Sequence, residues 1–196
     1  MHRAHETSVS GQTVHPDSAA ALPVQAMSDP TRNIDEPADV TLSRVVQLGF
    51  GGDEARFAQF LQALREITPS DVYVILRGSA VAGTRWADGA PFDADGPGTS
   101  DLDLTFVGAS MLAQFDEFYI PSLHSAPLCD ERPEASPALG PLRRTLCSIA
   151  RRPVNIQATS DLVQYVRDVT MHQPYVVLIE RQDAATPTAG ATCSVS

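Results

Sequence analysis

The residues best suited to chemistry are two aspartates, Asp101 and Asp103, in a segment that runs from Ser100 to Phe106. Polar and apolar residues alternate along this segment, which is typical of a half-buried β-strand. Asp101 and Asp103 therefore share one face of the predicted strand, about 7 Å apart along the backbone. Carboxylate oxygens are ligands that Mg²⁺ prefers in proteins. The pair predicts a site for one divalent cation or for a metal pair.

A second motif lies upstream, where the apolar run 72–76 ends at Arg77, Gly78 and Ser79. The run is short and rich in β-branched residues, so it predicts a buried strand. Glycine followed by serine makes a small-residue turn, which lets a bound group approach the backbone closely. The sequence thus pairs a turn that can receive a ligand with two carboxylates that can bind a cation.

A Gly78-Ser79 turn after one strand and Asp101-x-Asp103 at the start of the next resemble the DNA polymerase β-type nucleotidyltransferase superfamily. The resemblance covers roughly residues 54–180, and its specific motif lies within 76–104. It implies that the Gly-Ser turn holds a nucleoside triphosphate and that the two aspartates are catalytic ligands of Mg²⁺ or Mn²⁺. Arg77 or Arg85 is expected to assist at the phosphates. The implied activity is transfer of a nucleoside monophosphate group to an acceptor hydroxyl that the sequence does not identify.

The superfamily has a third carboxylate, on a later strand, that activates the attacking hydroxyl. The corresponding strand here is 153–158, and Asn155 or Gln157 occupies the expected position. An amide side chain cannot accept a proton as a general base. Either another aspartate supplies the base, or transfer is slow or absent and the chain is an impaired nucleotide- or protein-binding module. The candidate replacements are Asp93, Asp95 and Asp161.

The letters Asp-Leu-Asp-Leu-Thr at 101–105 also match the first motif of haloacid dehalogenase-type phosphatases. In those enzymes the nucleophilic aspartate closes a buried apolar strand, whereas Asp101 follows the turn-forming residues 96–100 and opens one. The chain also contains no lysine, a common phosphate ligand in that family. The nucleotidyltransferase interpretation is therefore preferred. A plainer alternative is that Asp101 and Asp103 only decorate an exposed strand face.

The composition limits the class of partner. The chain has 196 residues and 43% apolar residues, which suits one soluble folded domain. A formal net charge of −10 makes long nucleic acid an unfavourable acceptor and leaves a small molecule or a protein. The absence of lysine excludes P-loop phosphate binding and Schiff-base chemistry.

The chain also carries no sequence signal for a membrane or an oxidising compartment. No apolar run approaches the ~18 residues of a membrane span, and the first residues lack a signal-peptide pattern. Cys129, Cys147 and Cys193 have no metal-ligand spacing and form an odd set, so reduced thiols are expected. We therefore expect a cytoplasmic protein without a membrane partner.

The pattern of elements predicts an α/β (α+β) fold with a small mixed sheet and helices mainly on one face. Segments 1–39 and 182–196 are expected to be a disordered leader and a disordered tail. The resemblance implies that 40–181 form a nucleotidyltransferase-like domain. Expected helices span 40–50 (or an ordered lead-in), 54 onward with Asp53 as its cap, 111–119, 139–151 and 162–169; expected strands span 72–76, 100–106, 153–158 and 175–179; segment 121–141 is expected to be irregular.

The loop 83–99 contains further polar and aromatic candidates. Arg85 either reaches a triphosphate or is solvated. Trp86 either stacks on a base or covers the edge of the core, and the second interpretation is favoured. Asp93 and Asp95 neighbour glycine and proline, which is more typical of turns than of metal ligands.

Two later features are interpreted as surface. His124 is isolated in the proline-rich segment and predicts an exposed side chain. The arginines of the only basic cluster are expected at a solvated helix end, where the dipole favours them, and contact with phosphates or an acidic partner is the alternative. These arginines are Arg143, Arg144, Arg151 and Arg152.

Overall fold

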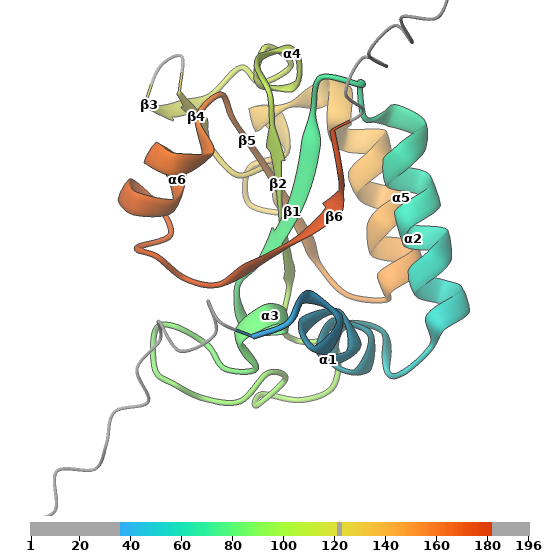
Figure 1. Cartoon of the computed structure of the whole chain (residues 1–196). Helices are drawn as coiled ribbons and strands as arrows, with labels where there is room; N and C mark the ends of the chain where they lie inside the picture. Colours follow the sequence, from blue (N-terminus) through green and yellow to red (C-terminus); the bar gives the residue numbers. More distant parts are fainter. Residues whose placement is uncertain (1–35, 121–122, 182–196) are drawn as a thin grey trace, which may run out of the picture.

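The computed structural model describes residues 36–120 and 123–181 (Figure 1). The tail predicted at 182–196 and nearly all of the leader predicted at 1–39 lie outside the described residues. The first described helix, α1 (Ala38–Phe50), begins two residues before the predicted start of the domain at residue 40.

The predicted α+β fold with a small mixed sheet is confirmed. The described strands form one six-stranded sheet in the order β3-β4-β5-β2-β1-β6. Neighbouring strands run antiparallel except for β2 and β5, which are parallel. The strands are β1 (Tyr73–Arg77), β2 (Leu102–Val107), β3 (Phe118–Ile120), β4 (His124–Ser125), β5 (Val154–Thr159) and β6 (Tyr175–Ile179).

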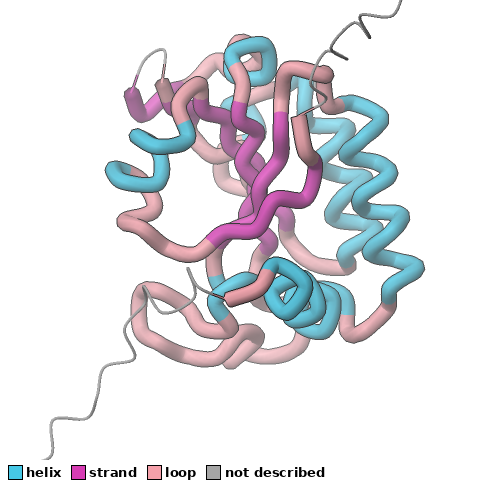
Figure 2. The backbone as a smooth tube through the Cα atoms, in the orientation of Figure 1, coloured by secondary structure: helices cyan, strands magenta, loops and turns pink. Residues whose placement is uncertain are grey.

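Helices lie on both faces of the sheet, but unequally (Figures 1 and 2). Helices α2 and α5 lie side by side on one face, and α6 lies on the other. None of the described helices combines the length and the apolar character that a membrane span requires. The remaining helices are α2 (Glu54–Ile67), α3 (Ser79–Ala82), α4 (Ala109–Leu112), η2 (Pro133–Ala135), η3 (Pro137–Leu139), α5 (Gly140–Ala150) and α6 (Leu162–Asp168).

The alternation in β2 divides the sheet into an apolar and a polar face. Leu102, Leu104 and Phe106 are fully buried in the core that also contains residues of α2 and α5. Asp103 and Thr105 lie on the opposite face, since side chains alternate along a strand, and the Thr105 hydroxyl bonds to Tyr165 of α6 (Leu162–Asp168). The apolar face therefore anchors the sheet, and the polar face is left to carry a site.

The two N-terminal helices form as the sequence predicts. Gly51 ends α1 in the left-handed conformation at φ 65°, which glycine adopts without strain. Asp53 then caps α2 by accepting a hydrogen bond from the Arg56 backbone N–H at 2.9 Å. Phe50 packs edge-to-face against Phe60, which joins the end of α1 to α2.

The prediction of a helix at 111–119 is wrong beyond residue 112. Helix α4 ends at Leu112, and residues 118–120 form the edge strand β3. The Asp116 N–H donates to Ala135 O at 2.9 Å, and Glu117 O accepts from the Ala126 N–H at 2.9 Å. These contacts with distant segments replace the local helical bonds.

The surface prediction for His124 is also wrong. His124 is fully buried in β4, within the segment predicted to be irregular, and its Nδ1 lies 2.9 Å from Thr159 Oγ1.

Half of the arginine cluster is buried as well. Arg143 bonds to Val154 O and Asp130, and Arg152 lies inside a polar network, whereas Arg144 and Arg151 are exposed as expected.

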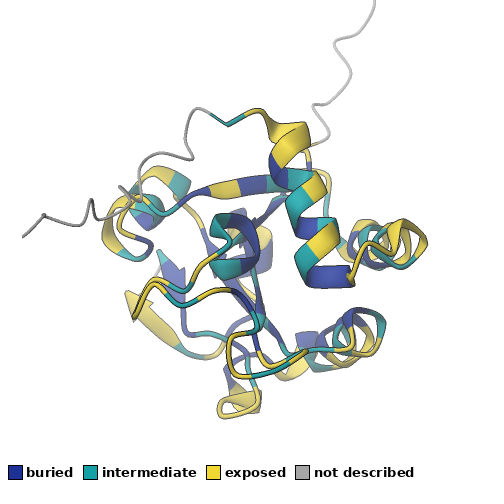
Figure 3. Cartoon of the chain, turned by 90° about the horizontal axis from the view of Figure 1, so that it is seen from below, coloured by how far each residue is buried: buried dark blue, intermediate teal, exposed yellow. Residues whose placement is uncertain are grey.

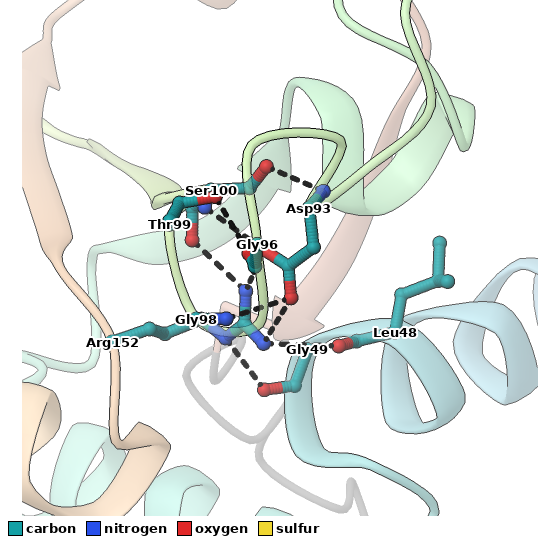
Figure 4. A network of polar contacts seen from close by, with 8 residues as sticks. All are labelled: Leu48, Gly49, Asp93, Gly96, Gly98, Thr99, Ser100 and Arg152. Carbon is teal, nitrogen blue, oxygen red and sulfur yellow. Dashed lines mark hydrogen bonds and ion pairs between the residues drawn. The ribbon is translucent and has the colours of Figure 1, made fainter.

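Arg152 joins three parts of the chain (Figure 4). Its guanidinium donates to the carbonyl oxygens of Leu48 and Gly49 at the end of α1 and to Ser100 O before β2. It also forms a two-oxygen ion pair with Asp93, at 3.0 and 3.1 Å. The backbone N–H groups of residues 98 and 100 donate to the same carboxylate. The interpretation of Asp93 as a turn residue is thus confirmed, and the turn is held against the sheet.

Figure 3 shows the end of the molecule that carries the loop 83–99. The strands are mostly buried in this view, and the residues of the loop are mostly exposed or half-buried. The Arg152 side chain is only 8% exposed. The loop therefore has little core of its own and depends on this charged network for its position.

We predict that Asp93→Asn destabilises the fold by about 3 kcal/mol, because it leaves the buried Arg152 guanidinium without its counter-charge. Asp95→Asn is the matched control, since exposed Asp95 pairs only with Arg85 at the surface, and it should cost less than about 1 kcal/mol. Urea unfolding at neutral pH measures both. Equal effects of the two substitutions would contradict the assignment.

The same pair predicts an acid dependence. Burial raises the pKa of Asp93, but hydrogen bonds from Arg152 and two backbone N–H groups outweigh it, so the pKa lies below 3.8. The contribution of Asp93 to stability is therefore complete above the unfolded value and is lost as the pH falls through the folded value. The stabilities of wild type and Asp93→Asn should converge below pH 3.8, and a constant difference would contradict this.

Candidate functional site

A row of polar side chains crosses the sheet on its polar face. Asp103 of β2 is paired with Arg77 at the end of β1 and with Asn155 near the start of β5. Asp101 lies just before β2 on the same face. The two predicted carboxylates thus lie beside the predicted turn.

Of the two residues considered for the third carboxylate position, Asn155 is the one that contacts both aspartates. Its Nδ2 donates to Asp101 Oδ2 at 2.5 Å and to Asp103 Oδ1 at 3.2 Å. One amide therefore bridges both carboxylates and holds them together. The other sequence candidate, Gln157, lies deeper and bonds to Arg77 and Tyr165.

Arg77 provides the positive charge of the row. Its Nη1 lies 3.7 Å from Asp103 Oδ2, with both side chains less than one-fifth exposed. Burial lowers the pKa of Arg77, but Asp103 and Tyr165 outweigh it and leave that pKa raised. Arg77 is therefore a fixed cation.

Tyr165 of α6 holds the Arg77 side chain in place through hydrogen bonds. Its hydroxyl accepts from Arg77 Nε at 2.9 Å and from Thr105 Oγ1 at 3.0 Å, and it donates to Gln157 Oε1 at 2.8 Å. The sequence predicts a helix at 162–169 but gives no sign of this role, because the contacts of Tyr165 with Thr105 and Gln157 arise only from tertiary packing.

The two carboxylates of the site lie close together in a partly buried place, which is electrostatically unfavourable. Burial raises the pKa of Asp101, and the neighbouring charge of Asp103 raises it further, despite the Asn155 hydrogen bond. One arginine faces two carboxylates, so the row has a net negative charge in a partly buried place. A cation bound between the carboxylates would relieve their repulsion.

Gly78 has the backbone conformation that the turn requires. Its φ of 81° and ψ of −159° lie in a region that is essentially confined to glycine. A Cβ atom at this position would lie 2.6 Å from Asp103 Oδ2. The glycine thus lets the carboxylate approach the backbone of the turn, directly before Ser79 starts α3.

The predicted site residues surround one cavity of about 360 Å³. This volume is within the range of small-ligand sites. The cavity brings together the six residues predicted to bind metal or phosphate, together with Trp86, the candidate for base stacking, and four others. Its lining consists of Arg77, Gly78, Ser79, Arg85, Trp86, Ala87, Thr99, Ser100, Asp101, Asp103 and Gln173.

Two loop residues differ from their sequence interpretations. Arg85 lines the cavity and is about one-third exposed, and its guanidinium is paired with Asp88 at 3.1 Å and with Asp95. Trp86 does not cover the core, because it is 51% exposed at the cavity.

The three carboxylates considered as replacement bases do not line the cavity. Asp93 is bound by Arg152, Asp95 pairs with Arg85, and Asp161 caps α6 by accepting from the Gln164 N–H. The structure thus brings the two candidate cation ligands together, and none of these three carboxylates lies at the cavity with them.

Across 36–120 and 123–181, the His, Cys, Asp and Glu side chains form no group of three or more that could hold a metal ion. Two carboxylates still suit Mg²⁺, which commonly takes its other ligands from substrate phosphates and water. No protein-family model matches the chain, and neither a curated protein nor a solved structure is significantly similar to it.

We predict that Gly78→Ala destabilises the fold by more than about 3 kcal/mol and displaces Asp103, because it combines backbone strain with a clash. Gly89→Ala is the control for strain alone: its φ is 70°, and no atom lies within 4 Å of the added Cβ. That change should cost about 1–2 kcal/mol. Thermal or urea unfolding measures both, and equal costs would contradict the close approach of Asp103.

Proposed function

We propose that this protein is a metal-dependent nucleotidyltransferase that moves a nucleoside monophosphate group from a nucleoside triphosphate to an acceptor hydroxyl. The observation that carries the proposal is the convergence of the Gly78 turn with Asp101 and Asp103 on one cavity. A turn open to the backbone suits phosphate oxygens, and two adjacent carboxylates suit the cation that accompanies them.

The charges of the site favour a nucleotide bound together with its metal. Asp101, Asp103 and Arg77 leave one net negative charge, which disfavours a free triphosphate. A divalent cation held by the two aspartates reverses the sign. Bound Mg²⁺ would stabilise the charge that develops on the phosphates during transfer.

The chain's own residues then have distinct roles. Asp101 and Asp103 hold the cation, and Asn155 holds them at a common position through its amide. Gly78 and Ser79 receive the phosphates. Arg77, fixed by Tyr165, restrains Asp103 and contributes positive charge at the cavity wall.

Asn155 limits the rate that this site supports. Its amide cannot take the proton of the acceptor hydroxyl, and none of the three replacement aspartates lines the cavity. Positioning and electrostatic stabilisation remain, and they dominate phosphoryl transfer. The second candidate function follows from the same observation: a module that binds a nucleotide without transferring it, or that binds a protein.

The nucleotide site is tested by thermal unfolding with each of the four nucleoside triphosphates, with and without Mg²⁺. Ligand at 100 times its dissociation constant stabilises a fold by about 2.7 kcal/mol. We expect a Mg²⁺-dependent rise in Tm for wild type and none for Asp101→Asn. Asp116→Asn, an exposed carboxylate outside the cavity, should respond like wild type. No rise with any nucleotide would overturn the proposal.

Asn155→Asp tests the missing base. A carboxylate at this position should raise nucleotidyl transfer at least about 10-fold, since a general base contributes about 10²–10⁴-fold. It should also lower stability without metal, because three carboxylates would then repel one another. Release of pyrophosphate measures the reaction. Gln157→Glu is the control, since Gln157 bonds to Arg77 and Tyr165 and should give no gain. Unchanged turnover in Asn155→Asp with nucleotide binding intact would show that the residue is not at the base position.

A further inference from the structure

The cavity has an aromatic residue at its wall that the cation and phosphate roles do not use. Trp86 is the only tryptophan of the chain, and it is 51% exposed. Exposed tryptophan is uncommon outside binding surfaces, because the indole has a large apolar area. Trp86 shares the lining of the cavity with Gly78 and Asp101.

The loop around Trp86 is braced by its own contacts. Thr84 and Pro91 form an antiparallel bridge, and the Arg85 N–H donates to Ala90 O at 2.7 Å. Asp88 accepts from the Ala90 N–H and pairs with the Arg85 side chain. The charge of Arg85 therefore serves the loop, and the loop presents the indole in a defined position.

A second polar residue reaches the cavity from a distant part of the chain. Gln173 follows α6 in a turn whose two preceding residues, Met171 and His172, have φ values of 49° and 62°. Such left-handed conformations are costly for residues other than glycine, and they cluster at functional sites. The Gln173 amide can both donate and accept hydrogen bonds.

We propose that Trp86 and Gln173 form a nucleobase subsite, in which the base stacks on the indole and its polar edge contacts the Gln173 amide. This inference rests on the proposed function, since the phosphates of the same nucleotide occupy the Gly78 end. A planar aromatic ring with hydrogen-bonding edges matches an exposed indole beside an amide. Arg85 positions Trp86 and does not contact the phosphates.

The experiment compares a nucleotide with the same phosphates lacking a base. Calorimetric titrations in Mg²⁺ use inorganic tripolyphosphate and the strongest binder among ATP, GTP, CTP and UTP. For wild type, the nucleotide should bind about 10-fold or more tightly than tripolyphosphate, given the strength of base stacking on aromatic side chains. It should also quench the fluorescence of Trp86, whereas tripolyphosphate should not.

Variants separate stacking from mere exposure of a ring. Trp86→Ala should lose at least 10-fold in nucleotide affinity and nothing in tripolyphosphate affinity, and Trp86→Phe should retain most of the difference. Thermal unfolding of both variants should match wild type, because the side chain is half exposed.

The outcomes distinguish the two proposals. Equal affinities for nucleotide and tripolyphosphate in wild type, or no loss in Trp86→Ala, would overturn the subsite and leave the cation and phosphate site intact. Failure of both ligands to bind to wild type would overturn the proposed function, and the subsite with it.

Discussion

The repulsion between Asp101 and Asp103 is the constraint on which the site depends. Two carboxylates held together in a partly buried position are unfavourable, and the raised pKa of Asp101, due to burial and then to Asp103, reflects that cost. The structure compensates only in part. Asn155 donates to both aspartates, and Arg77 faces one of them, which leaves a net negative charge. In the proposed function a divalent cation would complete this arrangement, and the adjoining turn at Gly78 would receive the phosphates that accompany it.

Contacts remote from the cavity maintain this unfavourable arrangement. The Arg152–Asp93 pair ties the residues before β2 to the end of α1, so the backbone that leads into Asp101 is fixed. On the opposite side, the Tyr165 hydroxyl restrains Arg77. The Arg152–Asp93 pair and the Tyr165–Arg77 hydrogen bond both join side chains with little exposure. These contacts stabilise the fold because each polar group has a hydrogen-bond or charge partner. The fold thus uses buried polar contacts where an apolar core would leave no room for a ligand.

Local patterns were sufficient for much of this fold and site. Alternation at 100–106 predicted which face Asp101 and Asp103 share. Asn155, one of the two residues considered for the third carboxylate position, bonds to both aspartates. Predictions failed where contacts with distant segments determine the secondary structure or the burial of a residue. The helix expected at 111–119 gives way to β3 because residues 116 and 117 bond to 135 and 126. His124, Arg143 and Arg152 are polar residues whose burial depends on partners far along the chain, which periodicity cannot reveal. The participation of Trp86 and Gln173 in one cavity likewise depends on tertiary packing.

The most direct test of the central claim is a crystal structure with Mn²⁺ and a non-hydrolysable nucleoside triphosphate, using the anomalous scattering of manganese to locate the metal. The account predicts an anomalous peak about 2.0–2.5 Å from carboxylate oxygens of both Asp101 and Asp103, next to the phosphates at the Gly78 turn. A nucleotide bound without such a peak, or manganese bound only elsewhere, would contradict it.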